Sequence, residues 1–281
     1  MVTAQRLLET LTLDRLGDDV FSARSEGGEG RIFGGQVVAQ ALVAAYGTVE
    51  TFLCNSLHAY FVRAGDAAKP IRFEVERTRD GGSFSNRRVR ALQDGLLIFD
   101  FIASFHAPAE GLEFQIPMPG RPAPENVPSF YEQRLKVFAD AGPAVAAALA
   151  SGPPIEVRTA DPQDEAVGPP ARESWVRFAA PIGADQRLHD ALLAYVSDLN
   201  LLATAMRPHG LHWHSRGLQS ASLDHALWFH RPTNFNDWHL FLTDTPSTAG
   251  TRGMVRGSIY NIDGRLVATV AQEGLLRLRT S

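Results

Sequence analysis

Asp198 is the residue whose position in the sequence most suggests chemistry. It lies in a segment, 185–207, whose apolar residues recur at spacings of three and four, which predicts a helix. Asp198 follows Tyr195 by three residues and precedes Leu202 by four, so it borders the apolar stripe. An isolated buried carboxylate is costly to desolvate and therefore needs partners or a function. The alternatives are a solvated position or a cap for a neighbouring loop.

A second candidate site opens the Ala-rich segment 33–47. Gly34 and Gly35 would leave free backbone N–H groups at a helix N-terminus, and such groups bind anions and can stabilise an oxyanion. Gln36 and Gln40 lie one turn apart on one helix face. Instead of contributing to a site, both amides can simply form hydrogen bonds to neighbouring backbone groups. For Gln40 this second role is favoured.

The nine histidines provide further candidates. Three of them fall within 209–214 and resemble a metal cluster, but no carboxylate is interleaved with them. That composition favours a solvated loop, so no metal site is predicted. His58 could face a pocket, although a core position with satisfied hydrogen bonds is more common for such a histidine. Packing is the expected role of His225 and His230.

Several common active-site motifs are absent. Only two of the 27 basic Lys and Arg residues are lysines, and neither Lys69 nor Lys136 stands in a P-loop or kinase motif. Residues 81–85 approach G-x-S-x-G but lack the last glycine and precede a predicted strand, which excludes the α/β-hydrolase elbow. The glycines of 27–30 lack the dinucleotide-binding spacing.

Composition narrows the class of protein. The 281 residues are 44% hydrophobic and 21% charged, which is typical of a globular protein with a core. A net charge of −4 gives no electrostatic footprint for nucleic acid. The single cysteine, Cys54, excludes an internal disulfide and favours a cytoplasmic location. Without a long apolar run or a signal-peptide pattern, we expect no membrane insertion.

Two β-rich runs, 57–105 and 222–278, have the same order of features. Each contains an Asp-Gly pair between strands, and the pair at Asp94 precedes the pair at Asp263 by 169 residues. Such pairs predict hairpins in which both central residues have φ > 0. The matching order and near-constant offset indicate an internal duplication. Chance similarity between two meanders is the alternative.

Each β-rich run follows a predicted helix. The first helix covers 33–47, and the second covers 185–207 with Asp185 able to cap its start. Short strands are predicted ahead of these helices, at 21–24 and 174–178. A mostly apolar helix followed by an antiparallel meander is typical of the hotdog fold.

The fold class predicted is therefore α+β, a double hotdog in one chain. The N-terminal hotdog is expected over 1–115 and the C-terminal hotdog over 173–281. Most of the 17 prolines fall between Pro108 and Pro181, and proline interrupts both helices and ladders. We therefore predict a connector over 116–172, containing one helix at 129–150.

Six motifs occur in order along nearly the whole chain outside this connector. They are Phe33–Ala41, His58–Asp66, Arg79–Phe84, Ser197–Asn200, Asp224–Pro232 and Val270–Gly274. In these motifs the chain resembles the type II acyl-CoA thioesterases. The resemblance implies a double hotdog that hydrolyses fatty acyl-CoA thioesters to free acid and CoA, with a place in fatty acid metabolism.

The resemblance also implies a catalytic trio. The family's Asp on the second helix, Thr or Ser on the following strand and Gln on the last strand fall on Asp198, Ser222 and Gln272. At the repeat position of Gln272 the first half has Ala103 or Ser104, so one active site per chain is expected. We expect Asp198 to accept a proton from a water molecule that Ser222 and Gln272 hold.

Further expectations concern ligands and partners. Gly34, Gly35, Gln36 and His58 are the expected substrate-binding residues. Acyl-CoA is the expected substrate, without a cofactor, a metal or nucleic acid. By analogy with the family, a homodimer or homotetramer is expected.

Three alternatives remain at this stage. A hotdog enoyl-CoA hydratase would need a paired Asp and His near the active-site helix, whereas the polar neighbours of Asp198 are Ser197 and Asn200. A non-catalytic acyl-CoA-binding protein would bind the substrate but release no thiol. A structural assembly subunit would have no need of the intact trio.

Overall fold

The computed structural model describes residues 3–25, 30–137, 153–161, 167–213 and 215–279. Within these residues the strands form one antiparallel sheet in the order β1-β2-β4-β5-β6-β3-β10-β13-β12-β11-β8-β7, with β9 paired to β13. The strands of the first half are β1 Asp14–Gly17, β2 Val20–Ala23, β3 Leu53–Phe61, β4 Ile71–Asp80, β5 Phe84–Gln93 and β6 Leu96–His106. Those of the second half are β7 Ile155–Arg158, β8 Ala171–Phe178, β9 Leu218–Ser222, β10 Asp224–Phe229, β11 His239–Ala249, β12 Arg252–Asn261 and β13 Leu266–Leu278.

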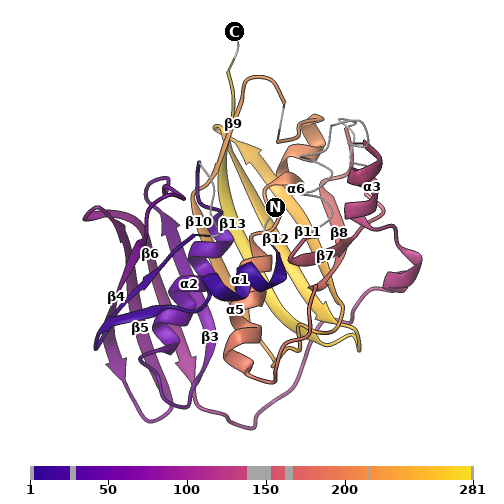
Figure 1. Ribbon diagram of the computed structural model, residues 1–281. Coiled ribbons are helices and arrows are strands. Elements are labelled where there is room, and N and C mark those ends of the chain that lie inside the picture. Colours follow the sequence, from indigo (N-terminus) through magenta and orange to yellow (C-terminus); the bar gives the residue numbers. More distant parts are fainter. Residues whose placement is uncertain (1–2, 26–29, 138–152, 162–166, 214, 280–281) are drawn as a thin grey trace.

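The two halves join edge to edge at strands β3 and β10. Leu57 of β3 stands opposite Leu227 of β10, so one sheet runs through both halves. The helices are α1 Ala4–Thr10, α2 Gly34–Tyr46, α3 Phe130–Val137, α5 Gln186–Ser197 and α6 Ala203–Met206, with short 3-10 turns at Pro124–Asn126 and Arg207–His209. Figure 1 shows α2 and α5 side by side where the two halves of the curved sheet meet. The predicted α+β double hotdog is confirmed.

Helix α2 lies within one residue of the predicted segment at each end. Nearly every side chain on it is buried, because the curved sheet packs on one side and α5 on the other. This explains its Ala-rich, uncharged composition, since a helix covered all round has no polar face to present. The adjoining sheet residues Phe73, Phe101 and Phe105 belong to the same continuous core.

The second predicted helix is interrupted, so the prediction of one helix over 185–207 is wrong. Helix α5 begins as expected after Asp185, whose side chain accepts the backbone N–H of Arg187. It then ends at Ser197 with Asp198 as its C-terminal cap. Asn200 adopts the left-handed region at φ 56°, which asparagine tolerates better than most residues. Apolar spacing did not reveal the break, because the leucines beyond it are buried or packed against the core as well.

The two Asp-Gly pairs form hairpins of different geometry. Asp94 and Gly95 both have positive φ, 50° and 76°, as predicted for a two-residue turn. At the second pair only Gly264 does, with φ 80°, so the prediction for Asp263 is wrong. The Asn261 side chain accepts the backbone N–H groups of Asp263 and Arg265, which stabilises a longer turn.

The proline-rich region is only partly described. Helix α3 covers the start of the predicted 129–150 helix, and residues 138–150 lie outside the described residues. Strand β7 also falls within 116–172 and pairs with β8. The unit boundaries at 115 and 173 stay a prediction. Within the described residues, none of the helices combines the length and apolar character needed to cross a membrane.

Candidate active site

Asp198, Ser222 and Gln272 meet in space although three different elements carry them. Asp198 follows the last turn of α5, Ser222 ends β9, and Gln272 lies in the middle of β13. The Gln272 Nε2 atom donates a hydrogen bond to Ser222 Oγ at 3.0 Å. Ser222 Oγ in turn donates to Asp198 Oδ1 over a longer distance of 3.5 Å. The structure therefore brings together the three residues of the predicted trio.

The Asp198 carboxyl is almost removed from solvent. Its exposed fraction is 7%, and that of Gln272 is 1%. Burial raises the pKa of Asp198 from 3.8 to about 7, because the charged form loses its hydration. Hydrogen bonds from Gln272, from the Gly35 backbone N–H and from Ser222 oppose this rise in the pKa. A carboxyl with a pKa near neutrality is suited to accept and return a proton.

The first half contributes its backbone to this site. A Cβ on Gly34 would lie 2.6 Å from Asp198 Oδ2, and one on Gly35 would collide with the backbone oxygen of Tyr195. Only glycine therefore allows the start of α2 to approach the end of α5 this closely. The positive end of the α2 dipole faces the Asp198 carboxyl, which favours its ionised form.

The groups expected to bind an anion at the start of α2 are partly engaged within the protein. The Gly35 N–H donates to Asp198, and the Gln36 N–H donates to the Phe33 backbone oxygen at 3.2 Å. The Gln36 side chain is buried and donates to Gln40 Oε1 at 3.2 Å. Gln40 donates to the backbone oxygens of Thr10 and Arg24, which confirms the backbone-satisfying role favoured for it.

His58 is not brought together with the trio. Its side chain is exposed, while its neighbours Leu57 and Ala59 are buried on the face that the helices cover. Since successive side chains of a strand point to opposite faces, His58 lies on the outer face of the sheet. There its ring packs edge-on against Trp228 at a centroid distance of 5.2 Å.

His225 is a neighbour of the trio whose contact the sequence pattern did not reveal. It is 1% exposed, and its Nδ1 lies 2.6 Å from Gln272 Oε1 while its Nε2 lies 2.8 Å from Ser197 Oγ. Burial lowers the pKa of His225 to about 4, so the ring is neutral at physiological pH. The contact arises from pairing of β10 with β13, in which Ala226 stands opposite Ala271.

Two further histidines within the described residues have local hydrogen-bond partners. His209 shares a hydrogen bond with Thr248 Oγ1, and His230 shares one with Thr269 Oγ1. His214 lies outside the described residues.

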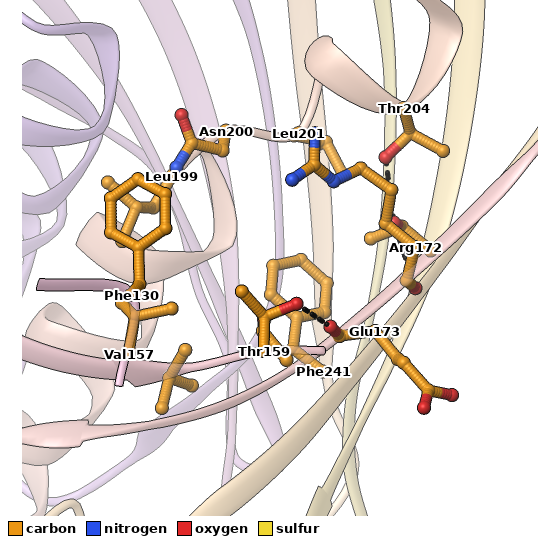
Figure 2. Close-up of a pocket in the computed structure, with 13 residues that line it drawn as sticks. Phe130, Val157, Thr159, Arg172, Glu173, Leu199, Asn200, Leu201, Thr204 and Phe241 are labelled. Atoms are coloured by element: carbon orange, nitrogen blue, oxygen red, sulfur yellow. Dashed lines mark hydrogen bonds between the residues drawn. The ribbon is translucent and has the colours of Figure 1, made fainter. Parts of the chain in front are cut away.

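A cavity lies beside the loop that follows Asp198. Figure 2 shows Leu199, Asn200 and Leu201 among the residues that line it, with the Arg172 side chain reaching from β8 toward that loop. Arg172 forms an ion pair with Asp161 at 3.5 Å. The cavity lining is mixed in polarity, and the three trio side chains are not part of it. The cavity therefore adjoins residues 199–201, which follow Asp198, but it is separate from the side chains of Asp198, Ser222 and Gln272.

Comparison with known proteins places both halves of the chain in one group. Residues 154–275 match the family model described as acyl-CoA thioesterase, and residues 23–106 match the acyl-CoA thioesterase N-terminal domain. Acyl-CoA thioesterase 2 of Haemophilus influenzae is 37% identical, with 96% of both chains covered. Human acyl-coenzyme A thioesterase 8 is 38% identical over 96% of this chain and 88% of its own length.

Solved structures agree with these matches. The crystal structure of the acyl-CoA thioesterase II TesB2 from Mycobacterium marinum superposes with a TM-score of 0.81 at 37% identity, covering 98% of this chain and 99% of its own. A hot dog fold protein from Alicyclobacillus acidocaldarius has a TM-score of 0.77 at 19% identity and covers 98% of both chains. The second similarity bears on the fold alone.

Proposed function

The chain belongs to the acyl-CoA thioesterase family, and on that basis we propose that it hydrolyses fatty acyl-CoA to free fatty acid and CoA. The observation that carries the proposal is the buried cluster of a carboxyl, a hydroxyl and an amide at Asp198, Ser222 and Gln272. Asp198 is the proposed base, and Ser222 and Gln272 complete the proposed catalytic trio.

The chemistry of a thioester matches this set of groups. The leaving group is a thiol, with a pKa of roughly 8.5 if cysteine is the guide, so it departs as a thiolate without a strong acid. Water is the difficult partner, because its pKa is about 15.7. In the proposed reaction Asp198 takes a proton from water while the water oxygen bonds to the carbonyl carbon. The tetrahedral intermediate then collapses, the C–S bond breaks, and the thiolate takes the proton from Asp198.

Ser222 and Gln272 have positioning roles in this scheme. Their hydrogen bonds hold the Asp198 carboxyl in place, and the Ser222 oxygen keeps one lone pair that can accept a hydrogen bond from the attacking water. The N-terminus of α2, with Gly34 and Gly35, supplies the positive potential for the developing oxyanion. Removing one oxyanion donor typically costs about 10²–10³ in turnover. His58 lies on the opposite face of the sheet and is left out of the proposed site.

The test is release of thiol, followed with a thiol-reactive dye and a panel of short-, medium- and long-chain acyl-CoAs. Asp198→Asn keeps the shape of the side chain but removes the base, and we expect its turnover to fall about 10²–10⁴-fold. Asp190→Asn is a matched control, because Asp190 is a second buried carboxyl on α5 that contacts Tyr46 and Gln186 instead. Binding of acyl-CoA without thiol release by the wild-type protein would identify a binding protein and contradict the proposal.

We further propose a homodimer or homotetramer and a cytoplasmic location. The first rests on the analogy with the family, and light scattering behind size exclusion measures it. The second is supported by the single cysteine, Cys54, which is buried and unpaired. Cell fractionation tests it.

A further inference from the structure

We propose that His225 is a positioning residue that fixes which end of the Gln272 amide faces Asp198 and Ser222. The inference rests on the proposed function of the trio and adds a residue that does not touch the reacting atoms. It starts from the chain of contacts that runs from Ser197 through His225 to Gln272.

The two ends of the Gln272 amide have opposite hydrogen-bonding character. The Oε1 atom only accepts, and the Nε2 atom only donates. In the observed arrangement Nε2 donates to Ser222 Oγ and to the Asp198 carboxyl, so Oε1 faces His225 Nδ1 at 2.6 Å. His225 must therefore carry a proton on Nδ1 to complete this contact.

The ring holds a single proton, because burial lowers the pKa of His225 to about 4. With that proton on Nδ1, Nε2 is an acceptor and needs a donor. Ser197 Oγ provides one at 2.8 Å. The same hydroxyl also lies 2.8 Å from the backbone oxygen of Ala194, and its one proton can serve only one of the two acceptors. The direction of the Ser197 hydroxyl is thus coupled to the tautomer of His225.

The opposite tautomer would reverse the amide. A proton on Nε2 would turn Ser197 back to Ala194 and leave Nδ1 as an acceptor, which demands an N–H from Gln272. Gln272 would then turn Oε1 toward the carboxylate of Asp198, so that two acceptors face each other in a buried space. The Nδ1–H tautomer avoids that repulsion and keeps both amide hydrogens on Ser222 and Asp198. Asp224 is a charged group that acts on His225, and its negative charge raises the pKa of the ring. The Asp224 carboxylate itself accepts the Glu273 backbone N–H.

The tautomer can be measured directly. In the wild-type protein labelled with ¹⁵N-histidine, long-range ¹H–¹⁵N NMR distinguishes a protonated Nδ1 from a protonated Nε2, and loss of one signal set in His225→Asn assigns it. We expect Nδ1–H at neutral pH. A protonated Nε2, or an average of the two tautomers, overturns the inference whether or not the variants fold.

Kinetics provide the second readout. His225→Leu removes the donor, and we expect kcat to fall about 10–100-fold, by analogy with the loss of outer-shell hydrogen-bond partners at metal sites. KM should change little, and the acidic limb of the pH profile should move upward because Gln272 Oε1 loses its partner and the N–H bond from Gln272 to Asp198 is held less firmly. His225→Asn offers a side-chain N–H near the Nδ1 position and should recover part of kcat. Equal losses in the two variants, or an unmoved acidic limb, would contradict a positioning role.

His239 supplies the matched control. It is also 1% exposed, also has a pKa lowered to about 4 by burial, and shares hydrogen bonds with Thr233 and Asp237 away from the trio. We expect His239→Leu to lower the melting temperature while leaving the acidic limb in place. If the wild-type protein releases no thiol, the proposed hydrolase function fails, whereas the NMR result still decides the tautomer.

Discussion

A Cβ atom on Gly34 would lie 2.6 Å from Oδ2 of Asp198, so the first turn of α2 packs against the carboxyl at the end of α5 with no room for a side chain at position 34. This contact joins the two halves of the chain at the proposed reaction centre. It also makes the position of the carboxyl depend on a residue without a side chain.

Gly34→Ala should therefore damage catalysis more than folding. The added methyl group displaces either the carboxyl or the helix, and a shift of about 1 Å in a reacting group can lower the rate about 10²-fold. The measurement is kcat with a medium-chain acyl-CoA, together with circular dichroism. Gly82→Ala is the control, because a Cβ there meets open space. A folded Gly34→Ala enzyme with wild-type kcat would show that the close approach of Gly34 to Asp198 does not contribute to catalysis.

The rate of hydrolysis should rise with pH through about 7. Asp198 accepts a proton only in its ionised form, and burial raises its pKa to about 7. We expect kcat/KM to fall tenfold per pH unit well below that value. Asp190, whose pKa burial raises to about 6, lies outside the trio, so Asp190→Asn should retain the same acidic limb. If Asp190→Asn moved the acidic limb of the pH profile, the titration would belong to Asp190, and its assignment to Asp198 would be wrong.

Asp198→Asn should stabilise the folded protein at pH 8. The pKa of Asp198 is 3.8 in the unfolded reference and about 7 in the fold, so the folded state binds the proton more tightly. The free energy of unfolding consequently decreases as pH rises from about 4 to 7, and the penalty is fully present above 7. Removing it should add on the order of 1–4 kcal/mol at pH 8 and little near pH 4. Urea unfolding at both pH values measures this, and a gain independent of pH would exclude relief of charge burial as its cause.

Tyr46→Phe should weaken the fold without moving the pH limb. The Tyr46 hydroxyl donates to Asp190 Oδ2 at 2.5 Å and accepts the Cys54 N–H at 2.8 Å, linking the end of α2 to α5. Its loss leaves two buried polar groups short of a partner, at about 1–3 kcal/mol for each. Tyr60→Phe is the control, since Tyr60 is exposed on β3. Equal unfolding free energies for the two variants would contradict the structural role of the Tyr46 hydroxyl.

Local signals in the sequence predicted most elements of the fold. Glycines at both ends of the Ala-rich segment and its uniform apolar character located α2 to within one residue at each end. The Asp94-Gly95 turn was correct because a two-residue hairpin demands positive φ at both positions. The halves also followed the predicted order of helix and meander, since alternation of side chains along a strand is a short-range property.

Features that depend on tertiary packing could not be predicted from local sequence patterns. The break after Ser197 is hidden because the leucines on both sides of it pack into the same core. The contact of His225 with Gln272 depends on the register of β10 against β13, and the chain separates these strands by a whole hairpin. His58 is an expected substrate-binding residue, whereas the alternation of β3 directs its side chain to the outer face of the sheet.

The edge-to-edge union of β3 and β10 suggests a use for the proline-rich region between the halves. Cutting the chain there would give two fragments, one carrying α2 and the other carrying Asp198, Ser222 and Gln272. Neither fragment alone would hold both the carboxyl and the helix end that faces it. Thiol release from a mixture would then report on reassembly, which makes this chain a candidate for a split-enzyme sensor of protein association.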